Sequence, residues 1–182
     1  FMLGLCRKAF ESGSKLKKSQ WEKNGGYQLT GKTVGIIGCG QIGSDLIQLL
    51  APFECNLLIN DIIKKSELCR NYNARQVDLK TLIAKSDLIS LHVPLTSSTK
   101  KMVNSHFLQS MKPSAYLINT CRGAVIDQNI LKMALRENMI AGAALDVFFN
   151  EPPTDQELLA LPNLMVTPHI GGNAKEAVQA MG

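Results

Sequence analysis

A short apolar run followed by three glycines constrains the fold of this chain more than any other stretch. Residues 33–37 read Thr-Val-Gly-Ile-Ile, and Gly-Cys-Gly-Gln-Ile-Gly follows at residues 38–43. The apolar run predicts a buried strand, and the pattern of residues 44–50 predicts a helix directly after the glycines. A helix N-terminus offers unpaired N–H groups and the positive end of the helix dipole, and both favour an anion. The stretch therefore predicts a site for a phosphate-bearing ligand.

Further apolar runs alternate with stretches of helical character. About seven strands are predicted, at residues 34–37, 56–60, 74–77, 88–93, 115–119, 141–147 and 164–166. Later helices are predicted at residues 66–72, 79–85, 105–111, 127–138 and 154–161, with Asp127 as an N-cap. Most of the strands lack polar alternation, as expected for parallel strands covered on both faces. The chain therefore predicts an α/β fold, a doubly wound parallel sheet with helices on both faces (Rossmann fold).

Composition narrows the class of protein. A chain of 182 residues, 45% of them hydrophobic, suits one domain, and no apolar run approaches the roughly 20 residues of a membrane span. The net charge of +5 is modest, and its densest cluster, residues 15–18, lacks interleaved aromatics, so neither a nucleic-acid nor a membrane partner is expected. The five cysteines form no C-x-x-C pair, which predicts free thiols in a reducing, cytoplasmic compartment and no metal site.

The glycines and a later carboxylate predict a dinucleotide site. Gly38 allows the tight turn, Gly40 lets the backbone approach the pyrophosphate, and Gly43 lets the helix pack on the strand. Asp61 follows the next predicted strand, where its carboxylate can accept hydrogen bonds from both hydroxyls of the adenosine ribose. A methyltransferase site also uses a glycine turn and a later acid, so both ligand classes are open on these residues alone.

The same carboxylate bears on the choice of cofactor. Asp61 would repel a 2′-phosphate, which favours NAD over NADP. Lys64 and Lys65 follow closely and weaken that preference, although two lysines that open a helix are commonly just solvated.

Three groups suited to hydride chemistry follow predicted strands. Arg122, Glu151 and His169 stand at the carboxyl ends of three strands, where open α/β sheets place their ligands. Oxidation of a 2-hydroxy acid needs a base for the hydroxyl proton and a cation for the substrate oxygens. Histidine serves as base or acid, a carboxylate can fix its tautomer, and the arginine fork suits a carboxylate. We therefore expect Arg122, Glu151 and His169 to share one catalytic site.

The chain resembles the nucleotide-binding domain of the D-isomer-specific 2-hydroxyacid dehydrogenase family, in its phosphoglycerate dehydrogenase-like group. The stretches that carry the resemblance are residues 29–43, 91–96, 111–113, 117–123 and the segments around Asp146 and His169. No methyltransferase pattern shares them. Two departures stand near the expected cofactor: Cys121, where serine or alanine is usual, and Asn173, where threonine or tyrosine is frequent. We expect Cys121 to be a packing residue, because hydride transfer uses no nucleophile.

The resemblance implies roles by position. Arg122 corresponds to the substrate-binding arginine, His169 to the acid/base and Glu151 to its paired acid, while Asp146 lies near the nicotinamide end of the cofactor. His92 belongs to a loop along the cofactor and is expected to be structural. The implied contacts to NAD are Gly38, Gly40, Gln41, Ile42, Gly43, Asp61, His92, Val93, Pro94, Thr120, Cys121, Arg122, Asp146, His169, Gly171 and Gly172.

The resemblance also implies a second, flavodoxin-like lobe that this sequence lacks. Because the chain begins at Phe1, we interpret it as an excised cofactor domain, with residues 1–24 as part of an interdomain helix and an arm, and residues 25–182 as the Rossmann core. Residues 174–182 are expected to begin a closing helix. We expect this chain to bind cofactor with little or no turnover and to form a homodimer through the arm.

Two functions agree with these residues. The first is an NAD-dependent oxidoreductase of a D-2-hydroxy acid or 2-oxo acid, and the second is an NAD-sensing co-repressor scaffold of the same fold. Co-repressors keep Arg122, Glu151 and His169, but no partner motif or regulatory tail is evident here, which favours the enzyme. Within the family, the expected activity is phosphoglycerate dehydrogenase-like.

Overall fold

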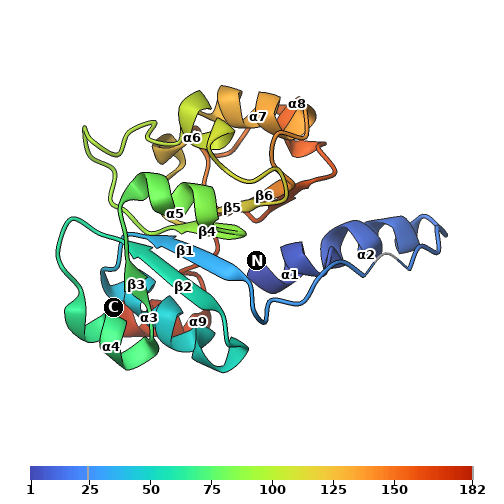
Figure 1. The fold of residues 1–182 in the computed structure, drawn as a ribbon. Coiled ribbons are helices and arrows are strands. Elements are labelled where there is room, and N and C mark those ends of the chain that lie inside the picture. Colours follow the sequence, from blue (N-terminus) through green and yellow to red (C-terminus); the bar gives the residue numbers. More distant parts are fainter. Residues whose placement is uncertain (24, 182) are drawn as a thin grey trace.

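A computed structural model describes residues 1–23 and 25–181 and contains one sheet of parallel strands (Figure 1). The strands are β1 (Thr33–Ile37), β2 (Asn56–Asn60), β3 (Arg75–Gln76), β4 (Leu88–Leu91), β5 (Tyr116–Asn119), β6 (Gly142–Leu145) and β7 (Leu164–Val166). Their spatial order is β3-β2-β1-β4-β5-β6-β7, and each neighbouring pair is parallel. The strand order reverses between β1 and β4, so a ligand crevice is expected at their carboxyl ends.

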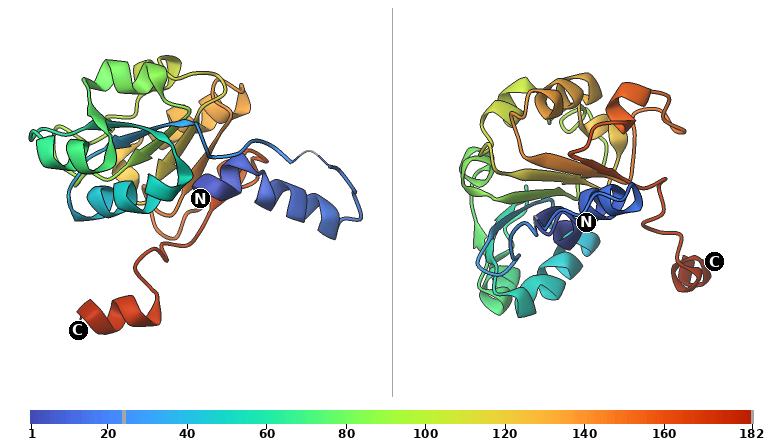
Figure 2. Two further views of the ribbon diagram at one scale, coloured as in Figure 1. Left: turned by 60° about the horizontal axis from the view of Figure 1, so that its bottom comes forward. Right: turned by 90° about the vertical axis from the view of Figure 1, so that its right-hand side faces the viewer.

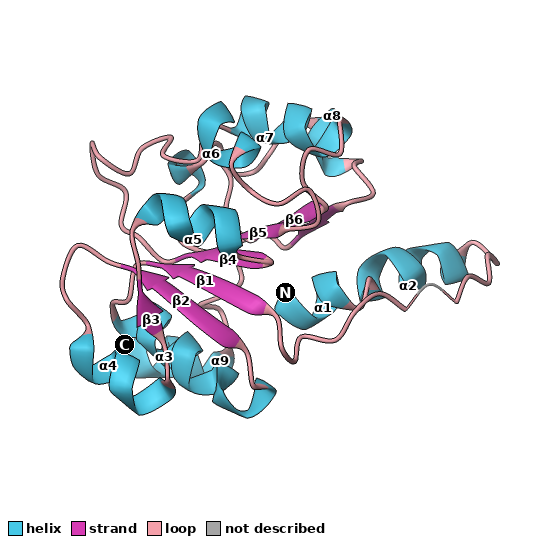
Figure 3. Ribbon diagram, viewed as in Figure 1, coloured by secondary structure: helices cyan, strands magenta, loops and turns pink. Residues whose placement is uncertain are grey.

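Helices cover both faces of the sheet (Figure 3). The α-helices are α1 (Met2–Cys6), α2 (Ala9–Lys17), α3 (Gln41–Leu50), α4 (Ser66–Tyr72), α5 (Leu79–Lys85), α6 (Ser105–Gln109), α7 (Gln128–Arg136), α8 (Gln156–Leu159) and α9 (Lys175–Met181), with short 3₁₀ turns η1 (Ala51–Phe53) and η2 (Gly123–Val125). Helices α5 to α8 lie on one face, whereas α1, α3 and α4 lie on the other.

The hydrophobic core consists of two layers because the sheet is apolar on both faces. Leu82, Leu117 and Leu131 belong to the layer under α5 to α8 and are fully buried. Ile36 and Ile47 belong to the layer under α1, α3 and α4. All four residues of β4 and of β6 are buried, as is typical of parallel strands between two helical layers. The predicted fold class is therefore confirmed.

The predicted elements agree with the observed ones, apart from differences at their ends. Helices α4 and α5 have the predicted limits, whereas α6, α7 and α8 are shorter than predicted. Asp127 takes the N-cap position of α7, as predicted. In the part of the chain that the structure describes, its side chain makes no capping hydrogen bond, and its carboxylate instead forms an ion pair with Lys101 at 3.0 Å.

The N-terminal arm, residues 1–23, is more helical than predicted. Residues 1–10 have a loosely helical apolar pattern and residues 11–19 are rich in Ser, Gly and Lys, which predicts a helix that ends near residue 10 and an exposed arm after it. In the structure α2 continues to Lys17, and Glu11 pairs with Lys15 one turn later at 3.0 Å. The arm is exposed as predicted, since α2 buries no residue. Asn24 and Gly182, which end the predicted arm and core, lie outside the described residues.

Helices α2 and α9 lie away from the sheet, whereas α1 packs against it through Met2, Leu5 and Cys6. Figure 2 shows α2 projecting from the body and α9 standing clear of the strands. Helix α9 lies within the segment predicted to begin a closing helix. In the described part of the chain, no helix combines the length and the apolar character that a bilayer crossing needs.

Candidate active site

The glycine turn joins β1 to α3 at the carboxyl edge of the sheet. Gly38 has φ +89°, and a Cβ there would lie 2.4 Å from the His92 carbonyl oxygen. A Cβ on Gly43 would lie 2.1 Å from the Gly38 carbonyl oxygen. Both positions therefore exclude any side chain, because the turn packs against the β4 end on one side and against α3 on the other.

Gly40 differs from the other two glycines because it faces open space. It is the N-cap residue of α3, and a Cβ built on it would meet no atom within 4 Å. The first N–H groups of a helix have no partner within the helix, so this end of α3 can receive an anion. An open glycine at a helix N-terminus fits a pyrophosphate that approaches the backbone closely.

Asp61 fixes the glycine turn to the end of β2. Its Oδ2 accepts a hydrogen bond from the Cys39 N–H at 2.7 Å, and its Oδ1 accepts one from the Ile63 N–H at 2.8 Å. Partial burial raises the pKa of Asp61, but these two backbone hydrogen bonds and the charge of Lys65 outweigh it and lower the pKa. The group is therefore a carboxylate beside the turn, where the ribose was predicted to bind.

A pocket of about 490 Å³ lies at the ends of β4 and β5. It is lined by Ile42, His92, Val93, Pro94, Leu95, Thr120, Cys121 and Arg122. The structure thus brings together three predicted segments: the start of α3, the loop after β4 and the loop after β5. Leu95 was not among the predicted site residues, although it continues the His-Val-Pro run.

His92 is held inside this pocket by the strand that precedes it. Its Nε2 lies 2.8 Å from the Ser90 hydroxyl, and burial lowers the pKa of His92 to about 4. The ring is therefore neutral near pH 7, in agreement with the expected structural role.

The loop after β5 is fixed by Asn119, which was not among the predicted site residues. Its Oδ1 accepts hydrogen bonds from the N–H and the thiol of Cys121, and its Nδ2 donates to the Arg122 carbonyl oxygen at 3.0 Å. Burial raises the pKa of the Cys121 thiol, so the sulfur carries its proton near pH 7. The Arg122 guanidinium is exposed and donates to the Cys121 carbonyl oxygen at 2.6 Å.

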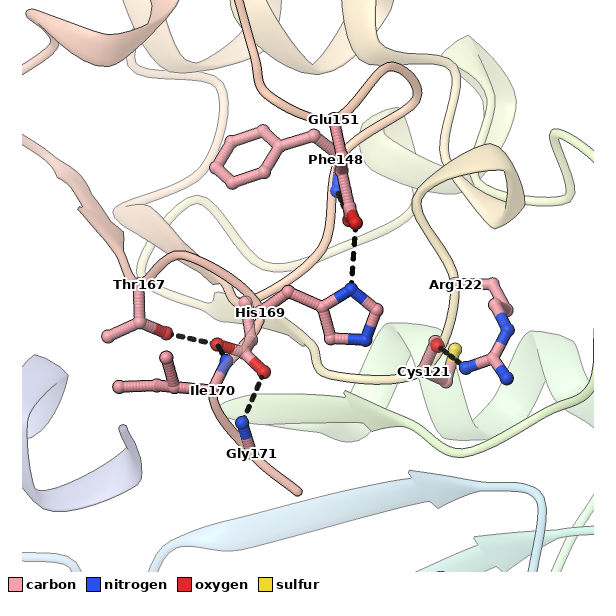
Figure 4. A network of polar contacts seen from close by, with 9 residues as sticks. Cys121, Arg122, Phe148, Glu151, Thr167, His169, Ile170 and Gly171 are labelled. Atoms are coloured by element: carbon pink, nitrogen blue, oxygen red, sulfur yellow. Dashed lines mark hydrogen bonds and ion pairs between the residues drawn. The ribbon is translucent and has the colours of Figure 1, made fainter. Parts of the chain in front are cut away.

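Glu151 and His169 are in direct contact across two loops (Figure 4). His169 Nδ1 lies 2.7 Å from Glu151 Oε2, and Glu151 Oε1 accepts a hydrogen bond from the Phe148 N–H at 2.9 Å. The hydrogen bond to His169 lowers the pKa of Glu151, and the one from Phe148 adds to the shift. Glu151 is therefore ionised at neutral pH and can only accept in this contact, so the His169 ring carries a proton on Nδ1 and donates it in the hydrogen bond.

Arg122 completes the predicted trio on a neighbouring loop. Figure 4 shows Arg122, Glu151 and His169 on three different loops at the same end of the sheet. Among the described residues, no hydrogen bond or ion pair joins Arg122 to the other two.

Asp146 lies directly after β6 and is 3% exposed. Its carboxylate accepts hydrogen bonds from the Thr167 hydroxyl and from the Ile170 and Gly171 N–H groups, the latter two at 2.9 Å. Its implied contact to the nicotinamide end of the cofactor stays a prediction. Gly172 faces open space, and no group of three potential metal ligands occurs within residues 1–23 and 25–181.

Comparison with known proteins places the chain in a family. The profile described as "D-isomer specific 2-hydroxyacid dehydrogenase, NAD binding domain" matches residues 1–171. The chain belongs to the D-isomer specific 2-hydroxyacid dehydrogenase family. The predicted resemblance is thereby confirmed, together with NAD as the cofactor of this domain.

Three relatives of this dehydrogenase domain illustrate the likeness. It is 41% identical to a glyoxylate reductase from Thermococcus litoralis, over 99% of this chain and 57% of that protein. It is 37% identical to a D-3-phosphoglycerate dehydrogenase from Methanocaldococcus jannaschii, over 100% of this chain and 35% of that protein. A crystal structure of D-lactate dehydrogenase with NAD⁺ from Lactobacillus jensenii matches with a TM-score of 0.88 and 31% identity, over 98% of this chain and 58% of that one.

The NAD-binding domain is thus the part that these proteins share. The chain spans 57% of the Thermococcus litoralis protein and 35% of the Methanocaldococcus jannaschii protein. Its residues fit the cofactor, because the open face of Gly40 at the start of α3 suits the pyrophosphate and the Asp61 carboxylate suits a ribose.

Proposed function

We propose that this chain is the cofactor-binding part of an enzyme that transfers hydride between NAD(H) and a D-2-hydroxy acid or its 2-oxo acid. The observation that carries the proposal is the contact of 2.7 Å between His169 and Glu151, at the sheet edge where Arg122 lines a pocket. A histidine held by a carboxylate, beside a pocket with an arginine, meets the needs of carbonyl reduction. NAD, when bound, supplies the hydride acceptor or donor.

His169 is the proposed acid/base. Because His169 Nδ1–H donates a hydrogen bond to the Glu151 carboxylate, Nε2 is the ring atom that exchanges a proton with the substrate. In reduction Nε2 gives a proton to the carbonyl oxygen, and in oxidation it takes the hydroxyl proton. The contact to Glu151 also fixes the orientation of the ring, and with it the direction of Nε2.

Arg122 is the proposed substrate anchor. Its planar guanidinium can donate two parallel hydrogen bonds to a carboxylate. The contact to the Cys121 carbonyl oxygen uses one terminal nitrogen, Nη1, so the guanidinium keeps donors for a substrate.

The charge of the pocket favours a small substrate with one negative charge. Within the described part of the chain, Arg122 is the one cation among the pocket-lining residues, and His92 beside it is neutral near pH 7. A phosphorylated 2-oxo acid carries additional negative charge and would need further cations. The part of the site that this chain supplies thus suits a substrate such as glyoxylate, whereas phosphohydroxypyruvate would need cations from the proposed substrate lobe; the relative from Thermococcus litoralis bears the name glyoxylate reductase.

We propose that residues 1–24 serve as an arm, residues 25–182 as the Rossmann core, and that a region outside this sequence supplies the substrate lobe. The greater length of the relatives supports this division. We also place the protein in the cytoplasm, a proposal that rests on its five free thiols.

A homodimer through the arm is a further part of the proposal. Helix α2 buries no residue, and Leu3, Phe10, Leu16 and Trp21 of the arm are all more than half exposed. A cleft of about 920 Å³ lies between the arm and the residues that flank β6 and β7. An exposed apolar face beside an open cleft suits a second copy of the chain.

Assays of the 182-residue chain and of the longer protein that contains it test the proposed function. The oxidation of NADH is followed by absorbance with glyoxylate, hydroxypyruvate, pyruvate and phosphohydroxypyruvate. We expect turnover by the longer protein, fastest with an unphosphorylated acid, and little or none by the chain alone. NADH binding without turnover of any 2-oxo acid by the longer protein would contradict the proposal and favour a cofactor-sensing scaffold.

A further inference from the structure

The backbone of His169 needs an external constraint. His169 has φ +54°, in the left-handed region, which costs a residue other than glycine about 1–2 kcal/mol. This conformation orients the ring towards Glu151, yet the ring is half exposed and the loop lies at the edge of the sheet. The loop therefore keeps this shape only if the residues around His169 are held.

Asp146 holds the loop on both sides of His169. Its Oδ1 accepts hydrogen bonds from the Thr167 hydroxyl and the Ile170 N–H, and its Oδ2 accepts one from the Gly171 N–H. One donor precedes His169 in the chain and two follow it (Figure 4). A single buried carboxylate thus fixes the backbone at both ends of the turn that carries the candidate acid/base.

The charge of Asp146 suits this task. Burial raises its pKa, but the hydrogen bonds from Thr167, Ile170 and Gly171 outweigh burial and lower it. The carboxylate is therefore ionised and accepts all three donors. Each carboxylate oxygen can accept about two hydrogen bonds, so Oδ2 retains capacity for one more donor, and the predicted cofactor contact is compatible with this role.

Asp146 and Glu151 belong to one segment, between β6 and α8. Glu151 binds the His169 ring, whereas Asp146 binds the His169 backbone through its neighbours. The segment after β6 therefore defines both the position and the tautomer of a residue that lies after β7.

We propose that Asp146 is a positioning residue that holds His169 in contact with Glu151. The inference rests on the proposed acid/base role of His169 for its functional meaning. Its test reads the geometry directly in the 182-residue chain, so it can fail or succeed independently of any turnover.

The test replaces Asp146 by asparagine, which keeps the shape but presents an NH₂ group to one of the loop donors. The readout is the pKa of Glu151, measured by carbon-13 NMR of its carboxyl group, with His169→Ala as the reference for complete loss of the contact. Loss of the Asp146 charge by itself lowers the pKa of Glu151, so a rise of that pKa in D146N can come only from a weakened contact to His169. In D146N we expect the pKa of Glu151 to rise towards its ordinary value, over a large part of the rise seen in H169A.

Two further variants separate positioning from stability. Asp87→Asn is the matched control, because Asp87 lies at the opposite edge of the sheet and accepts hydrogen bonds from Thr33 and Lys112. D87N should lower Tm and leave the pKa of Glu151 unchanged. Thr167→Val removes one donor to Asp146 and should raise that pKa by less than D146N does.

The outcomes are distinct. If D146N is folded and melts earlier while Glu151 keeps its wild-type pKa, Asp146 only stabilises the fold and the proposal is wrong. If D146N does not fold, the pKa of Glu151 is measured in T167V instead: a rise supports the proposal, and the wild-type value contradicts it. If Glu151 responds as expected but the longer protein reduces no 2-oxo acid, the proposed function fails and this inference stands.

Discussion

His169 Nδ1 lies 2.7 Å from Glu151 Oε2, although the two residues follow different strands of the sheet. Glu151 also accepts a hydrogen bond from the Phe148 N–H at 2.9 Å, so the backbone holds its carboxylate in place independently of the ring. The second contact matters for the chemistry, because a carboxylate that is fixed in place selects the ring tautomer of His169 and orients its Nε2.

The contact between Glu151 and His169 predicts that substitutions at the two residues have non-additive effects on kcat of the longer protein. Because Glu151 acts through His169, E151Q should lower kcat by roughly 10- to 100-fold and H169Q by roughly 10²- to 10⁴-fold. The double variant should be no slower than H169Q, since the carboxylate has no role without the ring. Steady-state kinetics of the four proteins measure this, and multiplicative losses would contradict it.

Two variants of the glycine turn should separate cofactor binding from stability. Gly40→Ala meets open space, so Tm should change little, but the new methyl group occupies the approach to α3 and should weaken NADH binding at least ~10-fold. Gly38→Ala places a Cβ 2.4 Å from a backbone oxygen at φ +89° and should lower Tm by roughly 5 °C or more.

Fluorescence titration with NADH and thermal melts of this chain check both variants. Wild-type NADH affinity in G40A would contradict a pyrophosphate at that position, while an unchanged Tm in G38A would contradict the strained turn.

The sequence predicted the sheet well because buried parallel strands are short apolar runs that differ plainly from the amphipathic helices between them. It also predicted the contact between Glu151 and His169, from the chemistry that a histidine and a carboxylate at neighbouring strand ends can share, and the family resemblance implied the same pair. It missed the continuation of α2, because Ser12, Gly13 and Ser14 are poor helix formers and the Glu11–Lys15 pair offsets them.

The supporting residues were less visible in the sequence. Asn119 and Thr167 act through hydrogen bonds to loops that only the folded chain brings together. A polar residue at the end of an apolar run is a weak signal for such a role, since many strands end in one. Loop geometry therefore had to come from the structure.

Asp61 predicts the cofactor preference. Its carboxylate is ionised and lies beside the glycine turn, so a 2′-phosphate would meet a like charge. Asp61→Ser removes that charge and should weaken NADH binding while raising the ratio of NADPH to NADH affinity by about 10-fold or more, helped by Lys65. Parallel titrations with both cofactors measure the ratio, and Lys65→Gln in the D61S background should reduce the gain. An unchanged ratio in D61S would contradict a ribose contact.

Asp87 predicts a pH-dependent stability. Its carboxylate accepts the Thr33 N–H and the Lys112 ammonium, both at 2.8 Å. Partial burial raises its pKa, but these two hydrogen bonds outweigh burial, so the folded-state pKa lies below the ordinary value of 3.8. The resulting stabilisation is fully present above pH 3.8 and is lost as the pH falls through the folded-state value.

Urea unfolding of D87N checks this expectation. At pH 7 the substitution should lower the free energy of unfolding by about 1–3 kcal/mol. The difference from wild type should begin to shrink as the pH falls below 3.8, because the unfolded wild-type chain then takes up a proton that the folded chain binds less readily. A difference that stays constant down to pH 2.5 would contradict the assigned contacts.

The arm predicts the state of association. Leu16 and Phe10 are 53% and 60% exposed on α2, which buries no residue, so they contribute little to the fold of one copy. In a dimer through this surface they would become buried, and Leu16→Glu would place a charge in an apolar contact. We expect wild type to sediment as a dimer and L16E as a monomer with nearly unchanged Tm at low concentration. Met133→Glu, at a similarly exposed apolar residue of α7, is the matched control and should remain dimeric. A wild-type monomer, or an L16E dimer of wild-type affinity, would contradict an interface at the arm.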